Sequence, residues 1–469
     1  MKKLSFLLFI SLLVLIIFSC RDDYNYDPAS KPLRFSKDTV MLDTVFSTVR
    51  SETYVLKVYN QQNDDVVIPG IYLEKGSFSQ FKINVDGFEG NSSNANNFQN
   101  IPLRSKDSLY IFIEIAPKGI STSEALADED LIFNTMGNTQ KVKLLSLIED
   151  AEFYFSKSGT KEISHDLFWN SSKSKVIYGT LKLTNNANLS VSEGTKIYLH
   201  KNASILIDSG SVLTLNGSLH KEVIIRGDRH ESRYDSLPGN WDQIRLARNS
   251  LAKVNHAVIK GGNNAFYLED NAQLIISNSK IYNFLYGGIY SIGGNVEGKN
   301  LALNNCGTSD LIALYGGNYD FTHCTFANYW NLNAGAGYAV YLSNSHQKSG
   351  KLQYKQLNAS FKNCILWVNN YNSLYIDNNP NAPFFYSFDT NLIKNNSNSI
   401  HVDTDNNFIH TILNKDPLFY KTGYSECLLS LTEDSPALGK GNLTYALSVP
   451  LDINGFPRTS APALGAYQE

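Results

Sequence analysis

A short pattern of apolar and polar positions returns five times between Ala252 and Asn379. Each copy is an apolar residue, a free position, an Asn, His or Gly, two free positions and a second apolar residue; the copies begin at Val254, Ile276, Val296, Phe321 and Phe361. Their intervals are 22, 20, 25 and 40 residues, the last with an insertion from Ser343 to Gln356. Such repetition, without an apolar stripe of helical length, is typical of a solenoid, because each repeat can bury its apolar side only against its neighbours. Since the repeats contain strands alone, we predict a parallel β-helix.

A second short strand is expected after each copy, at Ala265–Leu268, Gly288–Ser291, Leu311–Leu314, Ala339–Leu342 and Ser373–Ile376. Successive rungs of such a coil stack at roughly 4.8 Å, so equivalent residues form columns along its axis. The third position of the pattern predicts a corner column of His256, Asn278, Gly298, His323 and Asn363. Asn at a corner can hydrogen-bond to the rungs above and below, and we interpret the histidines of this column as structural.

The region before the coil has a different pattern. At residues 32–150, short strands of alternating character are separated by polar turns, which predicts an antiparallel β-sandwich. The runs at 42–46, 56–60 and 78–83 resemble immunoglobulin-like domains of the Hydin/abnormal-spindle type, which are usually spacers or docking modules. We therefore predict an all-β chain, with an immunoglobulin-like β-sandwich followed at residues 151–469 by the β-helix and a C-terminal capping segment.

Residues 1–20 have the pattern of a secretion leader: two lysines, an apolar run and a final Ser-Cys pair. The run is short for a membrane-spanning helix, and a small residue before Cys marks a cleavage site. This end resembles a bacterial lipobox, and the Arg-Asp-Asp that follows resembles the signal that sends lipoproteins of Bacteroidetes-type bacteria to the cell surface. We expect a lipid on Cys20 that anchors the protein in the outer membrane, facing the exterior, and a polar tether at residues 21–31.

Charge and cysteine usage narrow the classes of partner. The formal net charge is −3 and no basic tract is present, which argues against nucleic acid. Cys324 and Cys364 fall in one predicted column of what we count as adjacent rungs, where either a disulfide or a pair of free thiols fits the spacing. None of the cysteines outside the leader has the spacing of a zinc site, so we expect no metal and no cofactor.

One dense polar cluster runs from Arg226 to Asp235 and is followed by Trp241. Carboxylates beside arginines can form a general acid–base pair or a cation site. A hydrolase would use Asp228 or Asp235 with Glu231 as its two carboxylates. Intermingled charges of opposite sign more simply make a salt-bridged loop folded over Trp241. We interpret the cluster as structural and keep catalysis by these carboxylates as the alternative.

Several stretches together carry a family resemblance: spaced residues of 227–241, the run 316–330, and tail motifs at 452–455 and 464–467. They resemble a family of uncharacterised Bacteroidetes lipoproteins. The resemblance spans most of the mature chain and implies a right-handed parallel β-helix related to pectate-lyase-type folds. It implies no established activity.

Short Asp-Ser/Thr-aliphatic triplets match the O-glycosylation sequon of that bacterial phylum. They place the modified hydroxyl at Thr39, Thr44, Ser108 and Ser236. A triplet of this length also arises by chance, so each of these sites is a separate prediction.

A long coil offers a rigid side and ridged loops that suit extended ligands. The candidate ligand-binding residues are the aromatic pair Tyr329 and Trp330, with Tyr338 nearby and His346 and Tyr354 in the insertion, although Trp330 can equally fill the coil. We expect a non-catalytic surface lipoprotein that binds glycan or docks on another outer-membrane protein; the same residues also fit a purely structural spacer. The alternative is a polysaccharide lyase or glycoside hydrolase acting on an extracellular polysaccharide, an expectation that rests on fold analogy.

Overall fold

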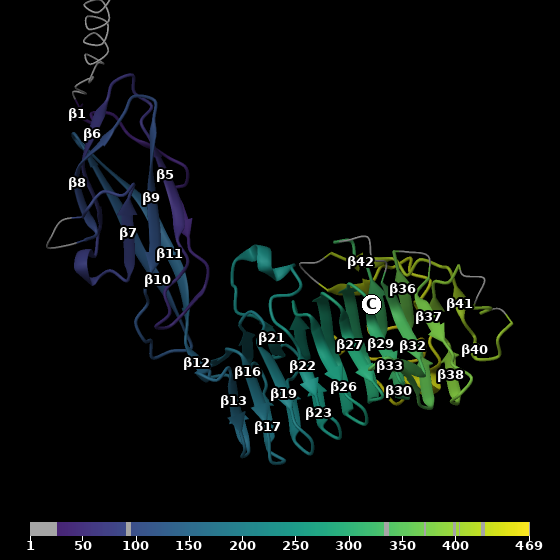
Figure 1. The fold of residues 1–469 in the computed structure, drawn as a ribbon. Coiled ribbons are helices and arrows are strands. Elements are labelled where there is room, and N and C mark those ends of the chain that lie inside the picture. The colour runs from purple at the N-terminus through teal and green to yellow at the C-terminus, as the bar shows by residue number, and fades with distance from the viewer. Residues whose placement is uncertain are drawn as a thin grey trace, which may run out of the picture. The chain divides into compact units, whose positions relative to one another are not determined.

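The computed structural model describes residues 26–90, 95–332, 337–369, 372–396, 400–402, 404–423 and 427–468, whose regular elements are almost all strands (Figure 1). The chain divides into two compact units. One holds the N-terminal residues up to Ile120 together with Glu124–Ile148, and the other holds Ser121–Ser123 and the chain from Glu149. Among these described residues, no helix is long and apolar enough to cross a membrane. Cys20, the expected lipidation site, lies outside them.

The first unit is a sandwich of a larger and a smaller β-sheet. The larger sheet consists of β1 (Asp27–Pro28), β3 (Thr39–Met41), β4 (Val45–Phe46), β6 (Val66–Leu73), β8 (Asn97–Leu103), β10 (Glu124–Thr135) and β11 (Asn138–Glu149). The smaller sheet consists of β2 (Arg34–Phe35), β5 (Tyr54–Tyr59), β7 (Phe81–Val85) and β9 (Ser108–Ile115). Alternate residues such as Leu56, Val58 and Ile111 are fully buried between the sheets.

The second unit is a parallel β-helix in which successive strands turn through three faces, within the described part of the chain (Figure 1). The open face consists of β14 (Leu167–Trp169), β17 (Asn188–Ser192), β20 (Val212–Asn216), β23 (Leu251–Asn255), the first halves of β26 (Gln273–Phe284) and β28 (Asn295–Cys306), β30 (Gly317–Thr322), β35 (Leu357–Lys362), β38 (Phe384–Asp389) and β40 (Phe408–Ile409). The fold class expected from the sequence, an immunoglobulin-like sandwich followed by a right-handed parallel β-helix, is confirmed.

The two other faces complete each rung. The covered face consists of β12 (Ala151–Tyr154), β15 (Ser174–Ile177), β18 (Lys196–Leu199), β21 (Val223–Gly227), β24 (Ala257–Lys260), the second halves of β26 and β28, β31 (Thr325–Asn328), β36 (Ile365–Val368), β39 (Leu392–Ile393) and β41 (Ile412–Leu413). The tyrosine face consists of β13 (Thr160–Ile163), β16 (Thr180–Leu183), β19 (Ser204–Ile207), β22 (Ile244–Leu246), β25 (Asn264–Leu268), β27 (Gly287–Ile292), β29 (Ser309–Leu314), β32 (Tyr338–Ser343) and β37 (Leu374–Asp377). The strands expected after each sequence repeat fall on the tyrosine face.

The corner between the open and covered faces holds the predicted column, with one correction. Strand register aligns His256, Asn278, Asn300, His323 and Asn363, and each has a positive φ between 46 and 53°. Asn is enriched in this left-handed region because its short polar side chain can bond locally. The sequence placed Gly298 in this column, which is wrong: Gly298 lies two residues earlier, inside the strand.

The interior of the coil is dry and partly aromatic. Phe321, Phe361, Phe388 and Phe408 occupy successive rungs, with ring centroids 5.3, 4.7 and 5.0 Å apart in near-parallel stacks. The first three are fully buried. Stacking of equivalent side chains in neighbouring rungs therefore binds each turn of the coil to the next.

The C-terminal segment, described at residues 416–423 and 427–468, contains β42 (Phe419–Lys421), β43 (Leu428–Leu431) and α2 (Leu443–Ala446). It packs on the outer side of the covered face, where Ile453, Ala466 and Tyr467 contact Tyr282, Ala302 and Ala327. Arg458 donates to Asn300 Oδ1 at 3.0 Å, and Asn300 Nδ2 donates to the Leu451 carbonyl at 2.7 Å. The segment predicted as a cap thus covers a side of the coil.

Candidate functional site

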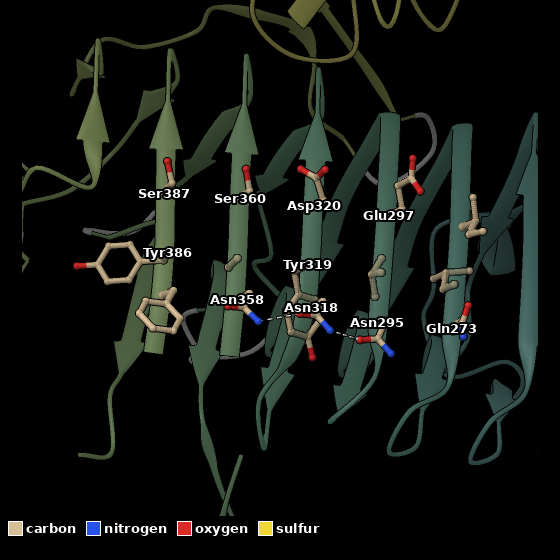
Figure 2. A pocket seen from close by; sticks show the side chains of 15 residues that line it. Gln273, Asn295, Glu297, Asn318, Tyr319, Asp320, Asn358, Ser360, Tyr386 and Ser387 are labelled. Atoms are coloured by element: carbon tan, nitrogen blue, oxygen red, sulfur yellow. Dashed lines mark hydrogen bonds between the residues drawn. The ribbon is translucent and has the colours of Figure 1, made fainter. Parts of the chain in front are cut away.

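The outer side of the open face forms a shallow groove of about 510 Å³, which we call the amide groove (Figure 2). Because side chains alternate along a strand, each of its strands sends two residues outward into the groove. Strand register sets these residues in two columns. The first column is Gln273, Asn295, Asn318, Asn358 and Phe385, and the second is Ile275, Glu297, Asp320, Ser360 and Ser387.

Amides in the first column are linked across the rungs. Asn358 Nδ2 donates to Asn318 Oδ1 at 2.8 Å, and Asn318 Nδ2 donates to Asn295 Oδ1 at 2.6 Å (Figure 2). An Asn amide carries two N–H donors and two acceptor lone pairs. Asn318 uses one of each within the row, so the other N–H and the other lone pair can bond to a ligand.

Carboxylates of the second column are neighbours but each faces a lysine. Glu297 and Asp320 are register partners on β28 and β30. Lys299 Nζ lies 2.8 Å from Glu297 Oε1, and Lys362 Nζ lies 2.7 Å from Asp320 Oδ1. Exposed pairs of this kind contribute about 0–1 kcal/mol to stability, so they chiefly balance the charge of the groove.

Apolar side chains mark both ends of the amide groove. Ile275 is 41% exposed at one end, and the Phe385 ring is 59% exposed at the other. An aromatic ring with that much free surface offers a flat apolar contact beside a row of hydrogen-bonding groups.

Each carboxylate of the predicted polar cluster is held by a cationic or titratable partner. Asp228 Oδ2 lies 2.7 Å from His200 Nδ1, and Arg229 Nε lies 3.2 and 3.1 Å from the two oxygens of Glu231. Asp235 Oδ1 lies 2.8 Å from Arg226 and 2.9 Å from Lys260.

The residue beneath the polar cluster is Trp241. Its side chain is fully buried, and its Nε1 donates to the Lys260 carbonyl at 2.8 Å. The cluster has the geometry of an ion-paired loop, and the carboxylates nominated for catalysis do not lie in the amide groove.

Of the aromatic pair nominated for ligand binding, Tyr329 is half-buried and Trp330 is buried, so Trp330 follows the alternative in which it packs inside the protein. Trp330 is 5% exposed, and the Tyr329 ring packs edge-on against Phe419 of the C-terminal segment at 6.3 Å. Tyr338 is half-buried, and its ring packs at a tilt against that of Tyr375, with the centroids 5.2 Å apart. The C-terminal segment returns over this part of the coil, and a local sequence pattern does not reveal that contact.

The sequence interpretation missed a row of tyrosines on the outer side of the tyrosine face: Tyr267, Tyr290, Tyr341 and Tyr375. Tyr267 and Tyr290 stack at 5.4 Å, and Tyr341 and Tyr375 at 4.6 Å. Because the rings stack on one another, much of their flat surface is already covered. Strand alternation could have revealed this row from the sequence, because each of these tyrosines sits between two inward-facing residues of its short strand.

The insertion forms a hairpin of β33 (Ser345–Lys348) and β34 (Lys351–Tyr354). His346 and Tyr354, predicted together as ligand contacts, stand on opposite sides of the hairpin, because His346 pairs with Gln353 and side chains alternate along a strand. His346 lines a second pocket of about 560 Å³, whereas Tyr354 does not.

Cys324 and Cys364 occupy one column of adjacent rungs, as predicted, but both are free thiols. Cys324 Sγ donates to the Thr322 carbonyl at 3.4 Å and Cys364 Sγ donates to the Lys362 carbonyl at 3.3 Å. The disulfide alternative is therefore not what the structure contains. Burial raises the pKa of Cys324, which keeps its thiol protonated and inert.

The predicted O-glycosylation sites Thr39, Thr44, Ser108 and Ser236 are all half-buried, and they stay predictions. Ser236 donates its hydroxyl to the Arg233 carbonyl at 3.2 Å. Within the described residues, no group of three or more His, Cys, Asp or Glu side chains could hold a metal ion.

Comparison with known proteins assigns no family: no protein-family profile and no curated protein sequence matches the chain. A solved GH87 α-1,3-glucanase catalytic unit from Streptomyces thermodiastaticus aligns at 10% identity over 78% of this chain and 84% of its own, with a TM-score of 0.28. A family 123 glycoside hydrolase from Clostridium perfringens aligns at 8% identity over 29% of this chain and 30% of its own, with a TM-score of 0.20. The ASH/PapD-like domain of human CEP192 aligns at 17% identity over 28% of this chain and 99% of its own, with a TM-score of 0.17. These scores are too low to transfer an activity.

Proposed function

We propose that this protein is a non-catalytic surface protein that binds an extended glycan along the amide groove. The observation that carries the proposal is the row of linked amides, each placed one rung from the next at roughly 4.8 Å. A sugar chain presents hydroxyl groups that both donate and accept hydrogen bonds. Asn318, at the centre of the row, keeps one N–H and one lone pair outside the row's own bonds, which matches that pattern.

The flanking residues of the amide groove favour an extended ligand over a compact one. The groove crosses β26, β28, β30, β35 and β38 along the axis of the coil. Phe385 at its end provides an exposed ring on which the apolar face of a sugar can stack.

Anchoring is the second part of the proposal. The lipobox-like end of the leader, with Cys20, supports attachment to the outer membrane with the coil facing the exterior. A lipid-anchored coil would hold its groove where extracellular glycans are accessible. Docking of another outer-membrane protein on the same groove is the competing non-catalytic use.

A second candidate function is glycan cleavage, and one observation favours it. Glu297 and Asp320 stand side by side in the groove, and glycoside hydrolases work with two carboxylates flanking the scissile bond. Against this, each carboxylate is already engaged in an ion pair with a lysine of its own strand or of the next rung. Binding is therefore the function that the geometry supports best.

The test is a panel of soluble polysaccharides in affinity gels and titration calorimetry. We expect the double variant Asn318→Ala, Phe385→Ala to lose glycan affinity by about tenfold or more. The matched control is Asn216→Ala, an exposed amide on β20 of the same face, outside the groove, and it should bind as the native protein does. Native-level binding by the double variant would rule out the groove.

Cleavage is tested on the same panel by release of reducing or unsaturated ends. The proposal expects no product from the native protein. Product formation that Glu297→Gln and Asp320→Asn both abolish, while the control retains it, would replace binding by hydrolysis or elimination as the function.

A further inference from the structure

The second pocket lies against the hairpin β33–β34 and differs in charge from the amide groove. This hairpin pocket has a volume of about 560 Å³. Its lining residues include Arg245, Arg248, Glu269, Asp270, His346 and Lys348. They come from the tyrosine face, from the turns that follow its strands, and from one side of the hairpin.

The hairpin is fixed to the coil at its base by a lysine. Lys355 Nζ donates to Asp270 Oδ1 at 2.7 Å, to Asn271 Oδ1 at 3.0 Å and to the Gly293 carbonyl at 3.2 Å. The Tyr315 amide also donates to the Ser345 carbonyl, at 3.3 Å. One wall of the pocket is thus an inserted element held in place across neighbouring rungs.

Cations exceed anions around the hairpin pocket. Glu269 pairs with Arg245, and Asp270 pairs with both Arg248 at 3.1 Å and Lys355 at 2.7 Å. Lys348 is exposed and has no ion-pair partner among the residues that the structure describes. Among the lining residues, the three cations Arg245, Arg248 and Lys348 face the two carboxylates of Glu269 and Asp270, which leaves an excess of one positive charge.

The hairpin pocket and the amide groove are neighbours on the same rungs. Asp270, Ile292 and Tyr315 line the pocket, and three residues further along each rung Gln273, Asn295 and Asn318 line the groove. Gln356, just after the hairpin, donates its amide to Asn358 of the amide row at 3.2 Å. A ligand that fills the groove can therefore extend a substituent or a branch across this turn.

We infer that the hairpin pocket binds an anionic substituent (a carboxylate, sulfate or phosphate group) of the glycan that lies in the amide groove. This inference rests on the proposed function and adds a ligand class to it. Arg245 and Arg248 provide planar guanidinium donors suited to such oxyanions, and Lys348 provides a charge that no carboxylate of the described residues neutralises.

The experiment compares polymers that share a backbone but differ in charge: dextran with dextran sulfate, and hydroxyethylcellulose with carboxymethylcellulose. We expect the native protein to bind the anionic member of at least one pair about tenfold more tightly, with the preference falling as salt is added. Lys348→Glu should remove this preference and leave affinity for the neutral member unchanged. Lys201→Glu is the matched control, because it makes the same charge change at an exposed lysine in the turn between β18 and β19 of the same coil, outside the pocket.

Equal losses in Lys348→Glu and Lys201→Glu would overturn the inference, since the anionic preference would then come from the net charge of the whole protein. A native protein that binds neutral and anionic polymers alike would overturn it while leaving the proposed function intact. Inorganic sulfate distinguishes the opposite case: thermal stabilisation of the native protein but not of Lys348→Glu, with no polymer bound, would keep the anion site and reject glycan binding.

Discussion

Two faces of the same coil differ in exposure: the C-terminal segment buries the covered face, whereas the open face is accessible. On the covered face the outward residues of successive rungs are Ala302, Thr325 and Ile365, all buried beneath the C-terminal segment. On the open face the outward residues of the middle rungs are amides, paired charges and hydroxyls, with Ile275 and Phe385 at the two ends, and the part of the chain that the structure describes leaves a groove there. Both faces have the same backbone and the same inward columns of apolar residues.

The comparison shows that the outward-facing residues of a face decide whether a further segment of the chain packs on it. A parallel coil buries its inward side chains whatever its outer residues are. Apolar outer residues gain about 25 cal/mol per Å² when a further segment covers them, whereas amides and charges would lose their water. The open face therefore stays available to a ligand, whereas the covered face does not.

The largest effect should follow from placing a charge under the C-terminal segment. Ala327→Asp puts a carboxylate at a fully buried position beside Tyr467, and an uncompensated buried charge costs about 3–5 kcal/mol. Ser360→Asp, on the open face, should change the free energy of unfolding by less than about 0.5 kcal/mol. Urea unfolding followed by tryptophan fluorescence measures both, because all 4 tryptophans lie in the coil unit. Equal stability of the two variants would break the comparison.

A smaller effect separates two asparagines of the same chain. Asn300 is buried and bonds to Asn278 at 3.0 Å, Leu451 at 2.7 Å and Arg458 at 3.0 Å. Asn300→Gly, chosen because its φ of 50° suits glycine, should lower the free energy of unfolding by about 2–3 kcal/mol. Asn318→Ala should leave stability within about 0.5 kcal/mol and weaken glycan binding instead.

Two quantities are measured for Asn300→Gly and Asn318→Ala. Urea unfolding gives the free energy of unfolding, and calorimetry gives the affinity for the polysaccharide of the panel that binds best. Burial lowers the pKa of Arg458 to about 10, so this guanidinium stays charged at neutral pH and needs the Asn300 acceptor. A stability loss in Asn318→Ala as large as that in Asn300→Gly would mean that the amides of the groove are structural, like those of the corner column.

The smallest expected effect is the pH dependence of stability that His323 of the corner column contributes. Burial lowers the pKa of His323 to about 2, and Asn363 Nδ2 donates to its Nε2 at 2.9 Å. Below about pH 6.5 the unfolded chain binds a proton that the fold excludes, so stability falls by up to about 1.4 kcal/mol per pH unit. This contribution is fully present above that pH.

His323→Asn should flatten the loss between about pH 7 and about pH 5, because Asn does not titrate in this range. His256→Asn is the control: burial lowers the pKa of His256 too, but this side chain is only half-buried, so its removal should change the slope less. Urea unfolding at successive pH values measures the slopes. Parallel curves for the native protein and His323→Asn would show that His323 is not excluded from protonation.

Periodic apolar positions predicted the coil because strand alternation is local and because every rung buries its inward side chains against the rungs on either side. The corner column was predicted at His256, Asn278, His323 and Asn363, and register confirms their alignment. Gly298 was misplaced because Val296 starts a pattern that fits the repeat two residues early. In the fold, Gly298 faces inward, where a Cβ would collide with the Phe321 ring.

The site was less predictable than the fold. Glu297 and Asp320 are 23 residues apart in sequence and become neighbours only through register, so no local pattern pairs them. The packing of Tyr329 could not be predicted for a related reason, because the Phe419 that contacts its ring comes from the C-terminal segment.

The sequence by itself determined which side chains face inward and how often the chain turns, because both follow from alternation and from the spacing of Asn and Gly at corners. Only the tertiary structure decided which outer columns are covered, which carboxylates meet, and that Lys355 fixes the hairpin over the rungs of Asp270 and Gly293. Those outcomes depend on contacts between residues far apart in the chain. Their energies are set by burial and register, which no short window of sequence contains.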